Sequence, residues 1–185
     1  MVIAPHEDDE TIACAGIIRK ALEKGQKVKL VLVTNGDYNG SHRSRERLIK
    51  TINAMAELGL SREHIIYFGY GDGTVLAPAY KAADQDEIFH SRDGNSATYG
   101  FADDPEILIG DCHYEIFNKH ADYTRRNILA DFTTVLWIEM PGEIYLPSPM
   151  ESHRDHSTTA LFFMEALHNV IFGFSTFTAA YTSAL

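Results

Sequence analysis

The chain has 185 residues, of which 45% are hydrophobic and 23% charged, and this ordinary globular composition predicts a single compact domain over residues 1–185. Acidic residues outnumber basic ones by 26 to 16, which gives a formal net charge of -10. Such a chain repels phosphate backbones and anionic lipid surfaces, so we expect no nucleic acid partner.

The two cysteines and the N-terminal residues exclude further classes. Cys14 and Cys112 lie far apart without Cys-x-x-Cys or Cys/His spacing, so neither a disulfide framework nor a thiolate zinc site is expected. No apolar run reaches the ~18 residues of a membrane span, and Met1 to Ala4 lack the features of a secretory signal. We therefore expect a cytoplasmic protein. The polar motif beginning at Pro5 leaves barely half a strand before it, which is consistent with a longer natural protein.

Four elements are predicted in the first 69 residues from their hydrophobic periodicity. They are a helix over about 11–24, a buried strand over 27–34, a helix over 41–58 and a strand over 64–69. Gly25 and Gly59 follow the two helices, as expected of helix C-termini. The strand at 27–34 is nearly continuous in its apolar half, which indicates burial on both faces.

The periodicity disappears over about 70–122, where Gly, Asp, Asn, Ser, His and Tyr dominate. A stretch this long without regular structure predicts a functional loop region, and we expect it to form one wall of a substrate site. Beyond it the pattern predicts a helix over 123–140, a short strand over 143–146 and a helix over 157–170 that an aromatic tail follows. Residues 133–138 alone also fit a strand.

This alternation of strands and helices predicts an α/β fold: a Rossmann-like, doubly wound, mostly parallel sheet with helices on both faces. In such sheets ligands bind at the loops beyond the carboxyl ends of the strands. Histidines and carboxylates are concentrated in those loops, at residues 6–10, 37, 72 and 153–156.

A catalytic zinc site typically has three protein ligands, often two imidazoles and one carboxylate, and a water in the fourth position. His6, Asp9 and His156 could supply such a set from two loops. Asp8 and Asp9 are adjacent, so one can bind metal while the other serves as general base. Of His153 and His156, one can bind metal while the other, held by Asp155, stabilises an oxyanion or protonates a leaving amine.

Each motif alone also has a simpler interpretation. An acidic run before a helix complements the helix dipole, and a His-Arg-Asp-His sequence before a helix is often an exposed polar turn. Because both motifs fall at the same predicted edge of the sheet, we favour a metal site.

Two segments resemble the signature motifs of the PIG-L/LmbE-like zinc deacetylases: Ala4 to Thr11, with His6-Glu7-Asp8-Asp9-Glu10, and His153-Arg154-Asp155-His156. The landmarks between them match in order over roughly the whole chain. They are Thr34-Asn35-Gly36-Asp37, Leu58-Gly59, Gly69-Tyr70-Gly71-Asp72 and Pro147-Ser148-Pro149. Glu7 stands where the family usually has proline, and Lys50 where its Arg-x-x-Glu motif has glutamate.

The resemblance implies a hydrolase that removes the acetyl group from an N-acetylglucosamine-type substrate with one Zn²⁺ ion. It implies metal ligation by His6, Asp9 and His156, with Asp8 as general base. It further assigns His153 to oxyanion stabilisation and Asp155 to the orientation of His153. Arg47 resembles a substrate-contacting arginine of the family, and we expect the loop carboxylates Asp37 and Asp72 to contact sugar hydroxyls.

Two rival functions remain open at this point. One is a zinc amidase that acts on another amide, such as a thiol conjugate, and the other is an inactive glycan-binding homologue. The presence of Asp8 argues against the second, because glycan binding needs no general base. The mixed nitrogen and oxygen ligand set also accommodates Fe²⁺, and the sequence leaves the oligomeric state open.

Overall fold

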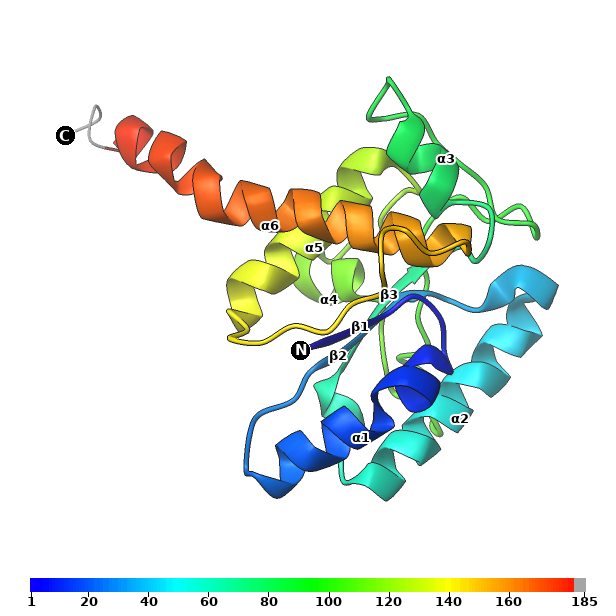
Figure 1. Cartoon of the computed structure of the whole chain (residues 1–185). Coiled ribbons are helices and arrows are strands. Elements are labelled where there is room, and N and C mark those ends of the chain that lie inside the picture. The colour runs from blue at the N-terminus through cyan, green and yellow to red at the C-terminus, as the bar shows by residue number, and fades with distance from the viewer. Residues whose placement is uncertain (182–185) are drawn as a thin grey trace.

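A parallel sheet forms the centre of the computed structural model, which describes residues 1–181 and the side chains of residues 1–173 (Figure 1). Its strands are β1 (Val2–Ala4), β2 (Leu30–Thr34) and β3 (Ile65–Tyr70), with β2 in the middle. On the free side of β1, Val2 makes a single parallel bridge to Tyr145. The chain therefore adds β2 and β3 on one side of β1 and the Tyr145 segment on the other side. Doubly wound sheets bind ligands at such a point, where the strand order reverses.

Helices cover both faces of this sheet, as predicted. The helices α1 (Asp9–Glu23) and α2 (Ser41–Leu58) pack on one face. The helices α3 (Leu76–Lys81), α4 (Cys112–Phe117), α5 (Arg125–Glu139) and α6 (Arg154–Tyr181) contribute to the other face. Two short 3₁₀ helices, η1 (Asp37–Asn39) and η2 (Arg62–His64), flank α2.

The sheet lies between two hydrophobic cores and contributes to both, because alternate side chains of each strand point to opposite faces. On β2, Leu30 and Leu32 belong to the core beneath α1 and α2, whereas Val31 and Val33 belong to the core beneath α5 and α6. All five residues of β2 are buried. This double burial explains why the strand reads as a nearly continuous apolar run.

The structure modifies several of the predicted elements. Beyond the end of β3, the region at 70–122 contains two six-residue helices, α3 and α4, and two isolated antiparallel bridges, Ala97 to Asp122 and Phe101 to Ile109. Each of these elements is too short to produce a periodic signal. Residues 133–138 lie within α5, so the alternative strand there is wrong. The strand expected at 143–146 is reduced to the bridge at Tyr145. The last helix begins at Arg154 and continues to Tyr181, so the aromatic tail is helical.

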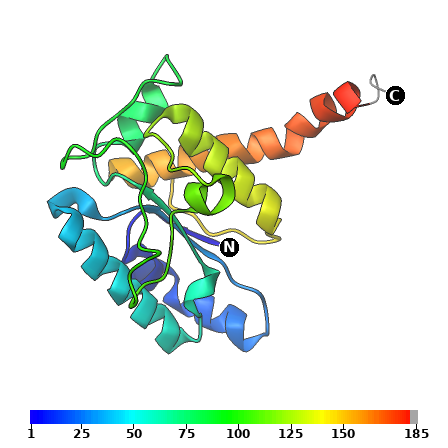
Figure 2. The same ribbon diagram turned by 180° about the vertical axis from the view of Figure 1, so that it is seen from behind.

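The loop region passes around the β3 edge of the sheet (Figure 2). Ile107 and Ile109 belong to the core under α2, whereas Cys112 belongs to the core on the opposite face. Most of the region thus closes the edge of the fold. Among the described residues, no helix has both the length and the apolar character that a membrane crossing requires.

Candidate metal centre

Three side chains from two distant segments meet at the reversal point of the sheet. His6 follows β1, Asp9 begins α1, and His156 lies in the first turn of α6. His6 Nδ1 lies 3.2 Å from His156 Nε2 and 3.3 Å from Asp9 Oδ2, and the latter two atoms are 3.3 Å apart. We call these three atoms the donor triangle.

The donor triangle fits a small divalent ion. Ligand distances of about 2.0–2.2 Å in a tetrahedral site place two donors about 3.3–3.6 Å apart, close to the distances seen here. Two imidazoles and a carboxylate are also a typical donor set for zinc and similar ions. Nitrogen atoms of His6, His153 and His156 lie within 4.8 Å of one another, so His153 is close to the same position.

The other ring nitrogen of His6 faces two further carboxylates. His6 Nε2 lies 3.2 Å from Asp72 Oδ1 and 3.2 Å from Asp155 Oδ2. Burial of the ring disfavours its charged form, but hydrogen bonds to Asp155, Asp72 and Asp9 outweigh this effect and raise the pKa of His6 to about 12. The surrounding carboxylates therefore favour a positive charge at this position, whether a proton or a metal ion carries it.

Asp8, which precedes Asp9 in the sequence, has a strained backbone conformation. Its φ of 145° belongs to a region that residues other than glycine rarely adopt, and its backbone N–H donates to Glu10 Oε2 at 2.9 Å. The Asp8 side chain remains 58% exposed and lies 3.4 Å from the Arg47 guanidinium. The carboxylate is thus accessible while its backbone is fixed.

A cleft of about 510 Å³, a volume that suits a small molecule, opens beside His6 and Asp8. It is lined by His6, Asp8, Tyr38, Asn39, Arg47, Asp72, Gly73, Ser152, His153, Arg154 and Asp155. Residues of both motifs contribute to this lining, together with Arg47 from α2, whereas Asp9 and His156 are not part of it. From the region at 70–122, Asp72 and Gly73 lie in this lining.

Two of the predicted site residues have different surroundings from those expected. The Asp155 carboxylate contacts His6 Nε2 and accepts the backbone N–H of Gly73 at 2.8 Å; it makes no hydrogen bond to His153, which is exposed. Asp37 is fully buried, accepts the Asp72 N–H at 3.0 Å, and does not line the cleft. Burial raises the pKa of Asp37. Asp37 thus supports the loop that carries Asp72.

Sequence reasoning missed three groups of the site. Glu151 Oε1 lies 3.0 Å from His156 Nδ1, on the side of that ring opposite the donor triangle. The Gly73 N–H binds Asp155, and the buried Glu7 carboxylate lies 3.3 Å from Arg47 Nε. For Glu151, the only signal in the sequence was a glutamate five residues before His156. The contacts of the Gly73 N–H and of Glu7 depend on loop geometry, which the sequence does not show.

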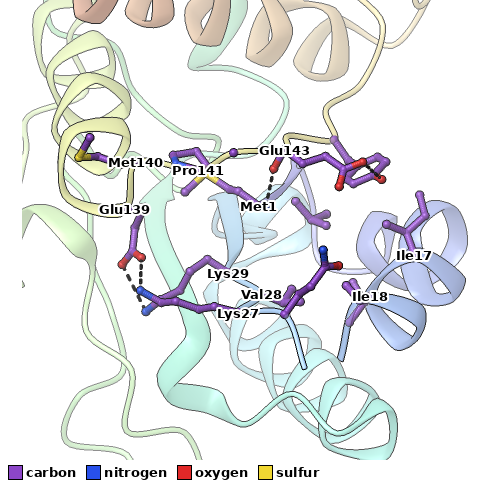
Figure 3. Close-up of a pocket in the computed structure, with 15 residues that line it drawn as sticks. Met1, Ile17, Ile18, Lys27, Val28, Lys29, Glu139, Met140, Pro141 and Glu143 are labelled. Atoms are coloured by element: carbon purple, nitrogen blue, oxygen red, sulfur yellow. Dashed lines mark hydrogen bonds and ion pairs between the residues drawn. The ribbon is translucent and has the colours of Figure 1, made fainter. Parts of the chain in front are cut away.

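A second hollow, of about 450 Å³, lies at the opposite end of the strands (Figure 3). There Glu139 pairs with Lys27 at 2.8 Å and with Lys29 at 3.4 Å. Its lining contains no histidine, and it shares no residue with the cleft. His6 lines the cleft and not this hollow, so the hollow lies outside the candidate metal site.

The fold and the site together define an α/β protein with a His/Asp site suited to a metal ion. A family model described as PIG-L, GlcNAc-PI de-N-acetylase, matches residues 1–167. The chain belongs to the PIG-L family. No curated protein matches the sequence.

Solved structures share this fold at low sequence identity. The N,N'-diacetylchitobiose deacetylase from Pyrococcus horikoshii is 21% identical with a TM-score of 0.57, over 91% of this chain and 48% of that one. GalB, the 4-carboxy-2-hydroxymuconate hydratase from Pseudomonas putida KT2440, is 16% identical with a TM-score of 0.56, over 89% and 53%. A deacetylase solved with teicoplanin is 14% identical with a TM-score of 0.54, over 91% and 65%.

The chain spans about half to two thirds of the length of these structures. They include two deacetylases and a hydratase, so the shared fold does not by itself determine the reaction. The reaction has to be argued from the site.

Proposed function

We propose that this protein is a metal-dependent deacetylase that hydrolyses the N-acetyl group of an N-acetylglucosamine-type substrate, with Zn²⁺ as its metal. The observation that carries the proposal is the donor triangle of His6, Asp9 and His156, with the accessible carboxylate of Asp8 in the adjoining cleft. Membership of the PIG-L family supports the same reaction.

An ion held by these three side chains would polarise the amide carbonyl and activate water. Asp8 accepts a proton from the attacking water, whose oxygen forms a bond to the carbonyl carbon. His153, exposed in the cleft, stabilises the negative charge that develops on the carbonyl oxygen. When the C–N bond breaks, a proton from Asp8 or His153 passes to the nitrogen, and the products are acetate and a free amine.

Acetate release from a panel of N-acetylglucosamine compounds tests this function. We expect activity with Zn²⁺-loaded protein, none after chelation, and a loss of about 10²–10⁴-fold in Asp8→Asn with its metal retained. His156→Ala should lose the metal itself, whereas His168→Ala, an exposed histidine of α6, should change neither metal content nor rate.

Two results would contradict the proposal. A wild-type protein that binds no divalent metal would remove its basis. A protein that binds Zn²⁺ tightly but releases no acetate from any compound would favour hydrolysis of a different amide, and a panel of thiol-conjugate amides would then test that activity.

A further inference from the structure

Glu7 has a buried carboxylate that the proposed reaction does not use. Its side chain has no exposed surface, and neither carboxylate oxygen has a hydrogen-bond partner. A buried carboxylate without hydrogen bonds is costly, so a charged neighbour is needed to stabilise it. Glu7 also lies between His6 and Asp8 in the sequence, close to the cleft.

That neighbour is Arg47 of α2. Arg47 Nε lies 3.3 Å from Glu7 Oε2, and Arg47 donates a hydrogen bond from a terminal nitrogen to the Glu7 carbonyl at 2.8 Å. The same terminal nitrogen lies 3.4 Å from Asp8 Oδ2. The Arg47 side chain is 31% exposed and lines the cleft. Because a guanidinium is planar and rigid, two contacts on its inner side fix the direction of its outer N–H groups.

Gly36 provides independent evidence that this arrangement is built into the fold. It follows β2 with a φ of 64°, and a Cβ atom there would overlap the Glu7 carboxylate and lie 3.0 Å from Arg47 Cδ. The absence of a side chain at Gly36 therefore allows the loop after β2 to close over the Glu7–Arg47 pair. The loop after β1, the loop after β2 and α2 meet at this point.

We propose that Glu7 is a positioning residue that holds Arg47 at the cleft, where the guanidinium binds an oxygen of the substrate beside the reacting amide. Asp8 and Arg47 thus face the same small molecule: Asp8 moves a proton, and Arg47 binds a substrate oxygen. This inference rests on the deacetylase function for its substrate, but the Glu7–Arg47 contact can be measured without any substrate.

The substrate-free test is the exchange of the Arg47 Nε–H proton, observed by ¹H–¹⁵N NMR and assigned by its loss in Arg47→Lys. We expect this proton to exchange slowly in the wild type and to lose its protection in Glu7→Met, which fills the space but removes the carboxylate that lies 3.3 Å from Nε. Glu7→Gln, which keeps a polar oxygen near Nε but not the charge, should restore part of the protection. An Arg47 signal that stays protected in Glu7→Met would overturn the proposal, whatever the enzyme's activity.

The second test is a double-mutant cycle on the binding of N-acetylglucosamine, measured by calorimetry and as KM. Loss of one charged hydrogen bond predicts about tenfold weaker binding in Glu7→Met and in Arg47→Ala, with no further loss in the double variant. Glu165→Gln, which breaks the ion pair with Arg125 away from the cleft, should leave KM unchanged. If the loss of affinity in the double variant equals the product of the losses in the two single variants, Glu7 does not act through Arg47. If the Arg47 Nε–H proton loses its protection in Glu7→Met as expected but the protein releases no acetate, only the deacetylase function is refuted.

Discussion

The two nitrogens of the His6 ring face different chemical groups, and this asymmetry determines how His6 can bind a metal. Nδ1 belongs to the donor triangle, whereas Nε2 lies 3.2 Å from both Asp72 and Asp155. A neutral imidazole that donates its Nε2–H to a carboxylate has its Nδ1 lone pair free for an ion. Asp155 therefore orients a metal ligand in this arrangement.

This arrangement predicts that Asp155→Asn weakens Zn²⁺ binding by about 10–100-fold, because the carboxylate that orients His6 is lost. His153→Gln, which removes a nearby ring outside the donor triangle, should leave the affinity unchanged. Competition with a chromophoric chelator measures both constants. A loss in His153→Gln as large as that in His156→Ala would identify His153 as a ligand instead.

The meeting of the two loops could be predicted from the topology, and the resemblance to the PIG-L family then selected His6, Asp9 and His156 among the side chains of those loops. His6 and His156 meet across 150 positions because the topology brings strand-end loops together. The partner of Asp155 and the role of Glu7 could not be predicted, because they depend on the directions of individual side chains. The strained φ of Asp8 is one local cause: it separates the side chains of Glu7 and Asp8, one buried and one exposed.

At the scale of the elements, helix positions were predictable where an apolar stripe ran for several turns. The helix expected over 123–140 is α5 at Arg125–Glu139, where the Thr124 side chain accepts the Asn127 N–H at 3.2 Å. The strand expected at 143–146 is short for a physical reason: Pro147 has no N–H to donate, so pairing ends soon after Tyr145.

Adjacent arginines in the first turn of α5 provide a matched pair for testing how the helices are held together. Arg125 makes three hydrogen bonds of 2.8–3.1 Å to Glu165 of α6 and lies over the Tyr80 ring at 5.3 Å, with only 16% of its side chain exposed. Arg126 pairs with Asp86 at 2.5 Å, but both side chains are largely exposed.

We expect Arg125→Ala to lower the free energy of unfolding by about 1–2 kcal/mol, because it removes a half-buried ion pair and a cation–π contact. Arg126→Ala should have no measurable effect, because water and salt screen an exposed pair. Urea denaturation of both variants beside the wild type measures the difference. Equal losses in the two would mean that burial of the Arg125 contact does not matter to stability.

At the scale of the whole molecule, the donor triangle links the start of the chain to α6. The loop after β1 and the first turn of α6 are far apart in the sequence, and they meet where the strand order of the sheet reverses. An ion bound there would cross-link the two segments in the folded state only. Metal binding should therefore stabilise the entire fold.

The thermal unfolding midpoint tests this linkage. At a free Zn²⁺ concentration of about 100 times Kd, binding adds about 2.7 kcal/mol, which corresponds to about 5–10 °C for a domain of this size. We expect chelation to lower the wild-type midpoint by that amount and to leave the midpoint of His156→Ala unchanged. His168→Ala, with the donor triangle intact, should respond to chelation as the wild type does. A His156→Ala protein that still gains several degrees from Zn²⁺ would place the stabilising ion outside the donor triangle.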